Sequence, residues 1–81
     1  MSPIKFYGKE VQMPKIPVKA ARIAANLTQE EMAKKLGITP SWYSIIESDP
    51  SKMAPYHYYA ILYITGFKAD DVFSPEESKK T

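Results

Sequence analysis

The sequence predicts an all-α fold, a compact bundle of about five short helices preceded by an extended or hairpin N-terminal arm. Apolar residues recur at the 3.6-residue period of a helix along the middle of the 81-residue chain. Residues that favour helix starts and stops separate these segments at short intervals. A chain of this length forms one domain with a small local core.

The stretch from Leu27 to Glu47, LTQEEMAKKLGITPSWYSIIE, contains the clearest signals. Thr28 and Glu31 have the spacing of a capping box, so a helix is expected to begin at Gln29. Gly37 suits the left-handed turn that ends such a helix. The next start follows at once, with a threonine cap and a proline at the first helical position. Two helices joined by a tight turn, a helix-turn-helix, are therefore predicted.

These residues resemble the phage-repressor and Cro-like (XRE-type) helix-turn-helix family. The segments that carry the resemblance are "LTQEEMAKKLGIT" and "IIE", and it extends from about Val18 to Phe73, with Gly66 and the closing "DDVF" included. The resemblance implies a bundle of the lambda-repressor-like type over residues 17–73. Residues 1–16 would then form the arm or small hairpin, and residues 74–81 a C-terminal tail.

The same resemblance implies roles for individual residues. In the family an arginine of the first helix commonly pairs with a glutamate at the end of the third, which predicts a structural ion pair between Arg22 and Glu47. The recognition helix of a helix-turn-helix enters the major groove. The residues expected to contact DNA are Gln29, Pro40, Ser41, Trp42, Ser44, Ile45 and Lys52. Family members usually carry more basic residues in the loop around Lys52, where this chain also has Asp49.

The remaining segments contain weaker signals. Alternation of Ile4 with Phe6 and of Val11 with Met13 allows a hairpin that turns at residues 7–10, and a flexible arm is the competing interpretation. Two isolated strands are marginal unless they pack on something else. A helix from Pro17 would use Val18, Ala21, Ile23 and Ala25 as its apolar face. The "KADDVF" segment matches the last short helix of the family, so the resemblance implies a short helix there, with Val72 and Phe73 turned inward.

A helix is expected from Pro55 to Gly66 in the tyrosine-rich segment "PYHYYAILYIT". Its helical spacing puts Tyr58, Ile61, Leu62 and Thr65 on one face, toward the core. Four residues are left as partly exposed candidates: Tyr56, His57, Tyr59 and Tyr63. Tyrosines are frequent in contact surfaces, although a small helical core built from tyrosines is the simpler explanation.

Composition excludes several functional classes. There is no cysteine and one histidine, so neither a disulfide nor a histidine or thiolate metal centre is expected. No glycine-rich phosphate loop or nucleophile–base pair is present, which argues against an enzyme and against any cofactor. The sequence has no run of about 20 apolar residues, the length that is needed to cross a membrane. A cytoplasmic location is expected, with association with the nucleoid when the protein is bound to DNA.

Charge is unevenly distributed. Residues 1–26 contain five basic residues against one acidic, so of the net charge of +2 the rest of the chain contributes −2. A basic N-terminal end is compatible with nearby phosphates.

The sequence and the resemblance together predict two alternative functions. The first is a small repressor or Cro-like regulator that binds double-stranded DNA as a homodimer at a roughly palindromic operator. The alternative is an anti-repressor or modulator that binds another phage or bacterial regulator through an apolar helix-turn-helix face.

Overall fold

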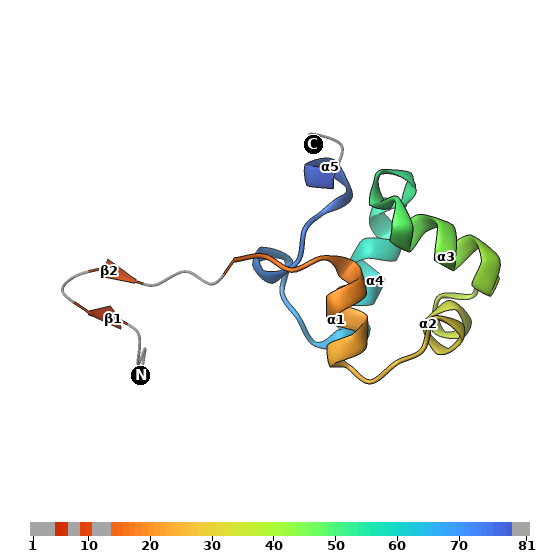
Figure 1. The fold of residues 1–81 in the computed structure, drawn as a ribbon, viewed down its shortest axis with the longest axis horizontal. Helices are drawn as coiled ribbons and strands as arrows, with labels where there is room; N and C mark the ends of the chain where they lie inside the picture. The colour runs from red at the N-terminus through yellow and green to blue at the C-terminus, as the bar shows by residue number, and fades with distance from the viewer. Residues whose placement is uncertain (1–4, 7–8, 11–13, 79–81) are drawn as a thin grey trace.

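The computed structural model describes residues 5–6, 9–10 and 14–78, and within them it contains five helices and one small two-stranded sheet (Figure 1). The helices are α1 (Val18–Ala24), α2 (Gln29–Leu36), α3 (Pro40–Ser48), α4 (Pro55–Thr65) and α5 (Pro75–Ser78). Two 3₁₀ turns lie between them, η1 (Pro50–Lys52) and η2 (Ala69–Asp71). The predicted helical bundle is confirmed.

The core forms where α1, α2, α3 and α4 meet. Helix α2 packs against α3, and α4 packs against both α1 and α2. The fully buried side chains include Met32 and Ala33 of α2, Tyr43 and Ile46 of α3, and Ile61 of α4. Because Ala33 has a small side chain, it allows α2 and α3 to approach closely. Met53, between η1 and α4, is also buried, and sequence periodicity did not identify it because it lies outside any helix.

The N-terminal residues include an antiparallel pair of two-residue strands, β1 (Lys5–Phe6) and β2 (Lys9–Glu10), in which Lys5 faces Glu10 and Phe6 faces Lys9. Pairing therefore includes residues 9–10, which the sequence had assigned to the turn. The predicted strand residues Ile4, Val11 and Met13 lie outside the described residues. Figure 1 shows β1 and β2 beside the helical body rather than within it.

The segment before α1 is tied to the segment after η2. Ile16 forms a parallel bridge with Val72, through hydrogen bonds from Ile16 N to Asp71 O (2.9 Å) and from Phe73 N to Ile16 O (3.0 Å). Lys15 Nζ also lies 2.6 Å from the carboxylate of Glu77. The hydrogen bond from Lys15 is the main reason that the pKa of Glu77 falls to about 2.

Three residues are placed differently from the sequence-based expectation. His57, expected at the surface, is only 9 % exposed, because it lies one helical turn before the buried Ile61. Phe73, expected inside, is half-exposed, since it follows the buried Val72 in extended backbone, where successive side chains point to opposite sides. Ile23 is also exposed, because Val18, Ala21 and Arg22 form the inward face of α1.

The "KADDVF" segment forms the single 3₁₀ turn η2 rather than a full helix. Tyr58 anchors it: the buried hydroxyl donates to Val72 O at 2.7 Å, with Ala69 O at 3.3 Å. Among the described residues, no helix combines the length and the apolar character that a membrane span requires.

We expect Tyr58→Phe to lower the free energy of unfolding by about 1–2 kcal/mol, because Val72 O would lose its donor in a buried site. Urea denaturation measures the change. Tyr63→Phe is the matched control, since Tyr63 is 90 % exposed and should lose almost nothing. Equal losses in the two variants would contradict the anchoring role.

Candidate nucleic-acid interface

Local sequence signals set the boundaries of α2 and the turn after it. Thr28 Oγ1 accepts from Glu31 N at 3.0 Å, and the Glu31 carboxylate accepts from Thr28 N at 2.8 Å, which completes the predicted capping box. Gly37 then adopts φ +76°. Ile38 N and Gly37 N bond back to Ala33 O (3.0 Å) and Lys34 O (3.2 Å), the pattern of a Schellman motif. The turn direction is therefore fixed by backbone hydrogen bonds.

Helix α3 begins at Pro40, where the sequence predicts it. Thr39 Oγ1 accepts from Trp42 N at 3.1 Å, and Pro40 occupies the first helical position. Tyr43, Ile46 and Glu47 are the buried residues of this helix. The opposite side of α3 is therefore left at the surface, and its orientation is set by the packing against α2.

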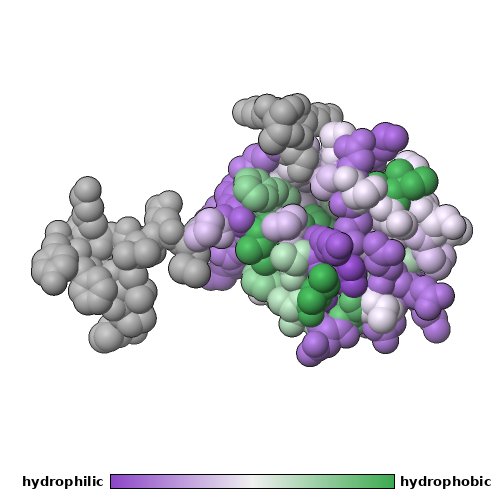
Figure 2. Space-filling model, viewed as in Figure 1, coloured by the Kyte–Doolittle hydropathy of each residue, from purple (hydrophilic) through white to green (hydrophobic). Residues whose placement is uncertain are grey.

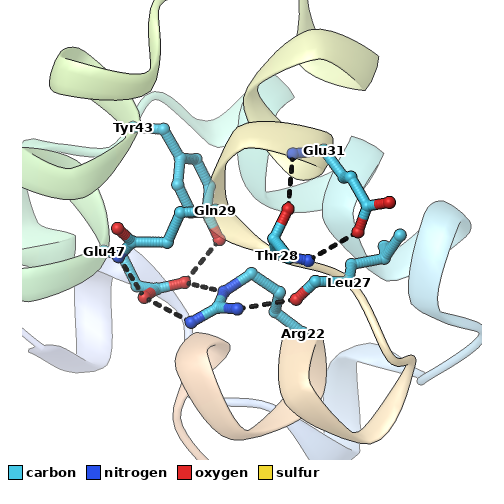
Figure 3. A network of polar contacts seen from close by, with 7 residues as sticks. All are labelled: Arg22, Leu27, Thr28, Gln29, Glu31, Tyr43 and Glu47. Carbon is cyan, nitrogen blue, oxygen red and sulfur yellow. Dashed lines mark hydrogen bonds and ion pairs between the residues drawn. The ribbon is translucent and has the colours of Figure 1, made fainter.

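A buried polar network joins α1, α2 and α3 (Figure 3). Arg22 of α1 donates to Glu47 of α3 through Nε (2.7 Å to Oε2) and Nη2 (3.2 Å to Oε1). Gln29 of α2 donates to Glu47 Oε1 at 2.9 Å, and the hydroxyl of Tyr43 donates to Oε2 at 2.7 Å. Arg22 Nη1 also donates to Leu27 O at 2.6 Å. One carboxylate thus receives donors from three helices.

The network determines how its members titrate. Burial alone would raise the pKa of Glu47, but hydrogen bonds from Arg22, Tyr43 and Gln29 outweigh it and lower that pKa. The hydrogen bond to Glu47 raises the pKa of the Arg22 guanidinium. Burial, and then the bond to Glu47, raises the pKa of the Tyr43 hydroxyl. At neutral pH the centre is therefore a charged arginine–carboxylate pair with a neutral tyrosine.

The residues expected to contact DNA are divided by the structure into one group on α3 and two residues elsewhere. The exposed α3 group comprises Pro40, Ser41, Trp42, Ser44 and Ile45. On the face that Figure 2 shows, hydrophobic side chains also reach the surface over α3, among hydrophilic neighbours. Lys52 is exposed on η1 and follows Ser51, whose hydroxyl donates to Asp49. Gln29 is half-buried.

Gln29 has a structural contact that the sequence analysis missed. Its side-chain amide already donates to Glu47, and an amide nitrogen carries two hydrogens, so one N–H remains for a ligand. Tyr43, at an apolar position of the helix predicted after Gly37, was not expected to form a hydrogen bond. The signal for its hydrogen bond was the i, i+4 spacing to Glu47, which places both side chains on one side of α3.

The outward surface of α3 carries no charge. Helix α3 contains one acidic residue, Glu47, which is buried, and no basic residue. The nearest basic residue along the chain after this helix is Lys52, with Asp49 between them. Within the residues that the structure describes, no group of three or more histidine, aspartate or glutamate side chains could hold a metal ion.

Breaking the buried network should cost more than any surface substitution. We expect Glu47→Ala to lower the free energy of unfolding by about 3–5 kcal/mol, because it leaves the Arg22 guanidinium buried without its partner. Urea or thermal denaturation is the measurement. Glu30→Ala, at an exposed position of α2, is the control. Thermal stability unchanged in Glu47→Ala would refute the structural role.

The lowered pKa of Glu47 also gives a pH dependence of stability. The folded pKa lies below 4.5, the ordinary value of a glutamate carboxyl, so the stabilisation is complete above about pH 4.5 and is lost as the pH falls through the folded pKa. Wild type should therefore lose stability more steeply below that pH than Glu47→Gln. Denaturation curves between pH 7 and pH 3 test this, and parallel pH profiles would count against it.

Comparison with known proteins matches the region just described. Residues 18–55 match a protein-family model described as helix-turn-helix, which covers α1, α2, α3, η1 and the start of α4. Comparisons with curated proteins and with solved structures give no significant match. A domain of this type is a DNA-binding regulatory domain and is not typically enzymatic. Residues 18–55 are thus a helix-turn-helix consistent with the Cro/C1-like, XRE-type family of transcription regulators.

Proposed function

We propose that the chain is a small repressor or Cro-like regulator that binds a roughly palindromic operator as a homodimer, with α3 in the major groove. The main support is the geometry of α2 and α3. The Gly37 turn and the network at Glu47 hold the two helices rigidly, while the exposed residues of α3 lie at the surface: Pro40, Ser41, Trp42, Ser44 and Ile45. A helix presented in this way can enter the major groove, which is about 12 Å wide and admits an α-helix.

Each exposed side chain has a distinct proposed role. Ser41 and Ser44 would hydrogen-bond base edges, and Pro40 and Ile45 would contact thymine methyl groups. The indole N–H of Trp42, the remaining N–H of Gln29 and the ammonium of Lys52 would bind phosphates, which position the protein without reading sequence. In a dimer, the two α3 helices would reach half-sites about 34 Å apart.

The chemistry of α3 implies modest base discrimination. Arginine, asparagine and glutamine make the strong bidentate contacts to guanine and adenine, and α3 contains none of them. Serine both donates and accepts, so it distinguishes bases weakly. Specificity would then depend partly on DNA shape and deformability. The proposed activity is occupation of DNA that excludes another protein, and it requires neither catalysis nor a cofactor.

A second function is favoured by one observation. Trp42 and Ile45 are 39 % and 42 % exposed on a surface of α3 that lacks charge. Large exposed apolar residues of this kind occur in protein interfaces, where aromatic side chains dominate the binding energy. The alternative is therefore a modulator whose α3 binds another phage or bacterial regulator instead of DNA.

A gel shift with promoter DNA from the chain's own genomic neighbourhood tests the first function. The variant Ser41→Ala/Ser44→Ala should bind about 10-fold more weakly than wild type, because two base contacts are lost. Ser48→Ala is the matched control, since the Ser48 hydroxyl bonds to Ile45 O at the end of α3. Equal binding by wild type and the double variant would contradict recognition through α3.

A salt titration separates the two functions. Operator binding should weaken as salt rises, because phosphate contacts release counterions. Lys52→Gln removes one cation from each protomer of the dimer, so it should reduce the logarithmic slope by about 2. A protein interface at Trp42 and Ile45 would change little with salt. No shift of DNA at low salt, together with direct binding of the neighbouring regulator, would replace the first function by the second.

A further inference from the structure

Helix α4 presents an exposed stripe of three tyrosines, Tyr56, Tyr59 and Tyr63, hereafter the tyrosine stripe. Their exposed fractions are 71 %, 62 % and 90 %. They are spaced at i, i+3 and i+7, so they lie along one side of the helix. The other side is buried, with Tyr58, Ile61 and Leu62 in the core. The stripe therefore faces away from the molecule's own interior.

The composition of α4 is that of a helix with partners on both sides. Its eleven residues include no lysine, arginine, aspartate or glutamate, and its single histidine is buried. Helices that are apolar all round are normally buried on all sides. Here α1 and α2 cover one side of α4. The three tyrosines of the stripe remain largely exposed.

The tyrosine stripe is separate from the proposed DNA surface. It lies on α4, beyond the matched residues 18–55, whereas the exposed residues proposed for DNA lie on α3 and η1. It also lacks the basic residues with which a protein binds phosphates. The stripe therefore requires an occupant of another kind, and that occupant could bind while α3 remains free.

We propose that the tyrosine stripe is a self-association surface whose occupant is the same stripe of a second copy of this chain. A twofold interface brings each residue of the patch against the same patch, so like charges would repel across it. A stripe without any charged residue avoids this repulsion. Aromatic residues are enriched and charged residues are depleted at interface cores, as they are here. Tyr59 is already ordered by an edge-on contact with Tyr58, 5.2 Å between ring centroids.

The size of the stripe sets the strength of the contact. A tyrosine side chain has about 200 Å² of surface to bury, and these three are already partly covered, so two stripes would bury on the order of 900 Å² in total. This is below the 1,200–2,000 Å² typical of stable complexes, which places the free dimer at the weak end.

The inference rests on the proposed function in one respect. Two adjacent half-sites would raise the effective concentration of one protomer near the other and so complete the dimer on DNA.

Sedimentation equilibrium of the full chain across a concentration series tests the proposal. Wild type should form dimers reversibly, and Tyr63→Glu should weaken them by about 10-fold or more, because each substitution acts twice at a twofold contact. Tyr63 is almost fully exposed, so this variant should keep its fold, which circular dichroism checks. Tyr59→Phe should retain dimers. Ser48→Glu, an exposed site on α3, is the control for the added charge.

The outcomes keep this proposal distinct from the DNA function. Tyr63→Glu should bind a single half-site as wild type does and lose the tighter binding to two half-sites. Wild type that stays monomeric up to about millimolar concentration, or equal dimerisation of wild type and Tyr63→Glu, would overturn the assignment. If Ser41→Ala/Ser44→Ala dimerises normally and no variant binds DNA, the proposed function fails while the self-association surface stands.

Discussion

The arrangement of α1, α2 and α3 depends on the carboxylate of Glu47. Arg22, Gln29 and Tyr43 all donate to it, so each of the three helices contributes a group to one buried point. A buried charge is tolerated only when it is paired and hydrogen-bonded. The three helices must therefore keep the relative positions that bring these donors to the carboxylate. The outward direction of α3 follows from this constraint, because Tyr43 and Glu47 lie on its inward side.

Local signals in the sequence were sufficient for the boundaries of α2 and α3. Thr28, Gly37 and Thr39 act on backbone atoms within a few residues, so their effects do not depend on the rest of the fold. The pairing of Arg22 with Glu47 is different, because it joins residues 25 apart in sequence. It was expected only from resemblance to a family, since nothing local to either residue specifies the partner.

The remaining features depend on tertiary packing. The inward side of α4 was predicted correctly at Tyr58 and Ile61, but it extends one turn further to His57, which tertiary packing buries. Phe73 is exposed because the bridge between Ile16 and Val72 fixes which side of the extended segment faces inward. For the candidate site, sequence located the exposed residues of α3 but could not show that Gln29 already has an internal partner.

The uncharged outward surface of α3 has a kinetic consequence. Positive surfaces accelerate the encounter of a protein with DNA by long-range attraction, and this surface supplies none. A complex formed through it alone would associate at the slower rates typical of neutral partners, about 10⁵–10⁶ M⁻¹s⁻¹. How long such a complex lasts would then depend on close contacts made after arrival, and hence on how well the shapes of the two surfaces fit.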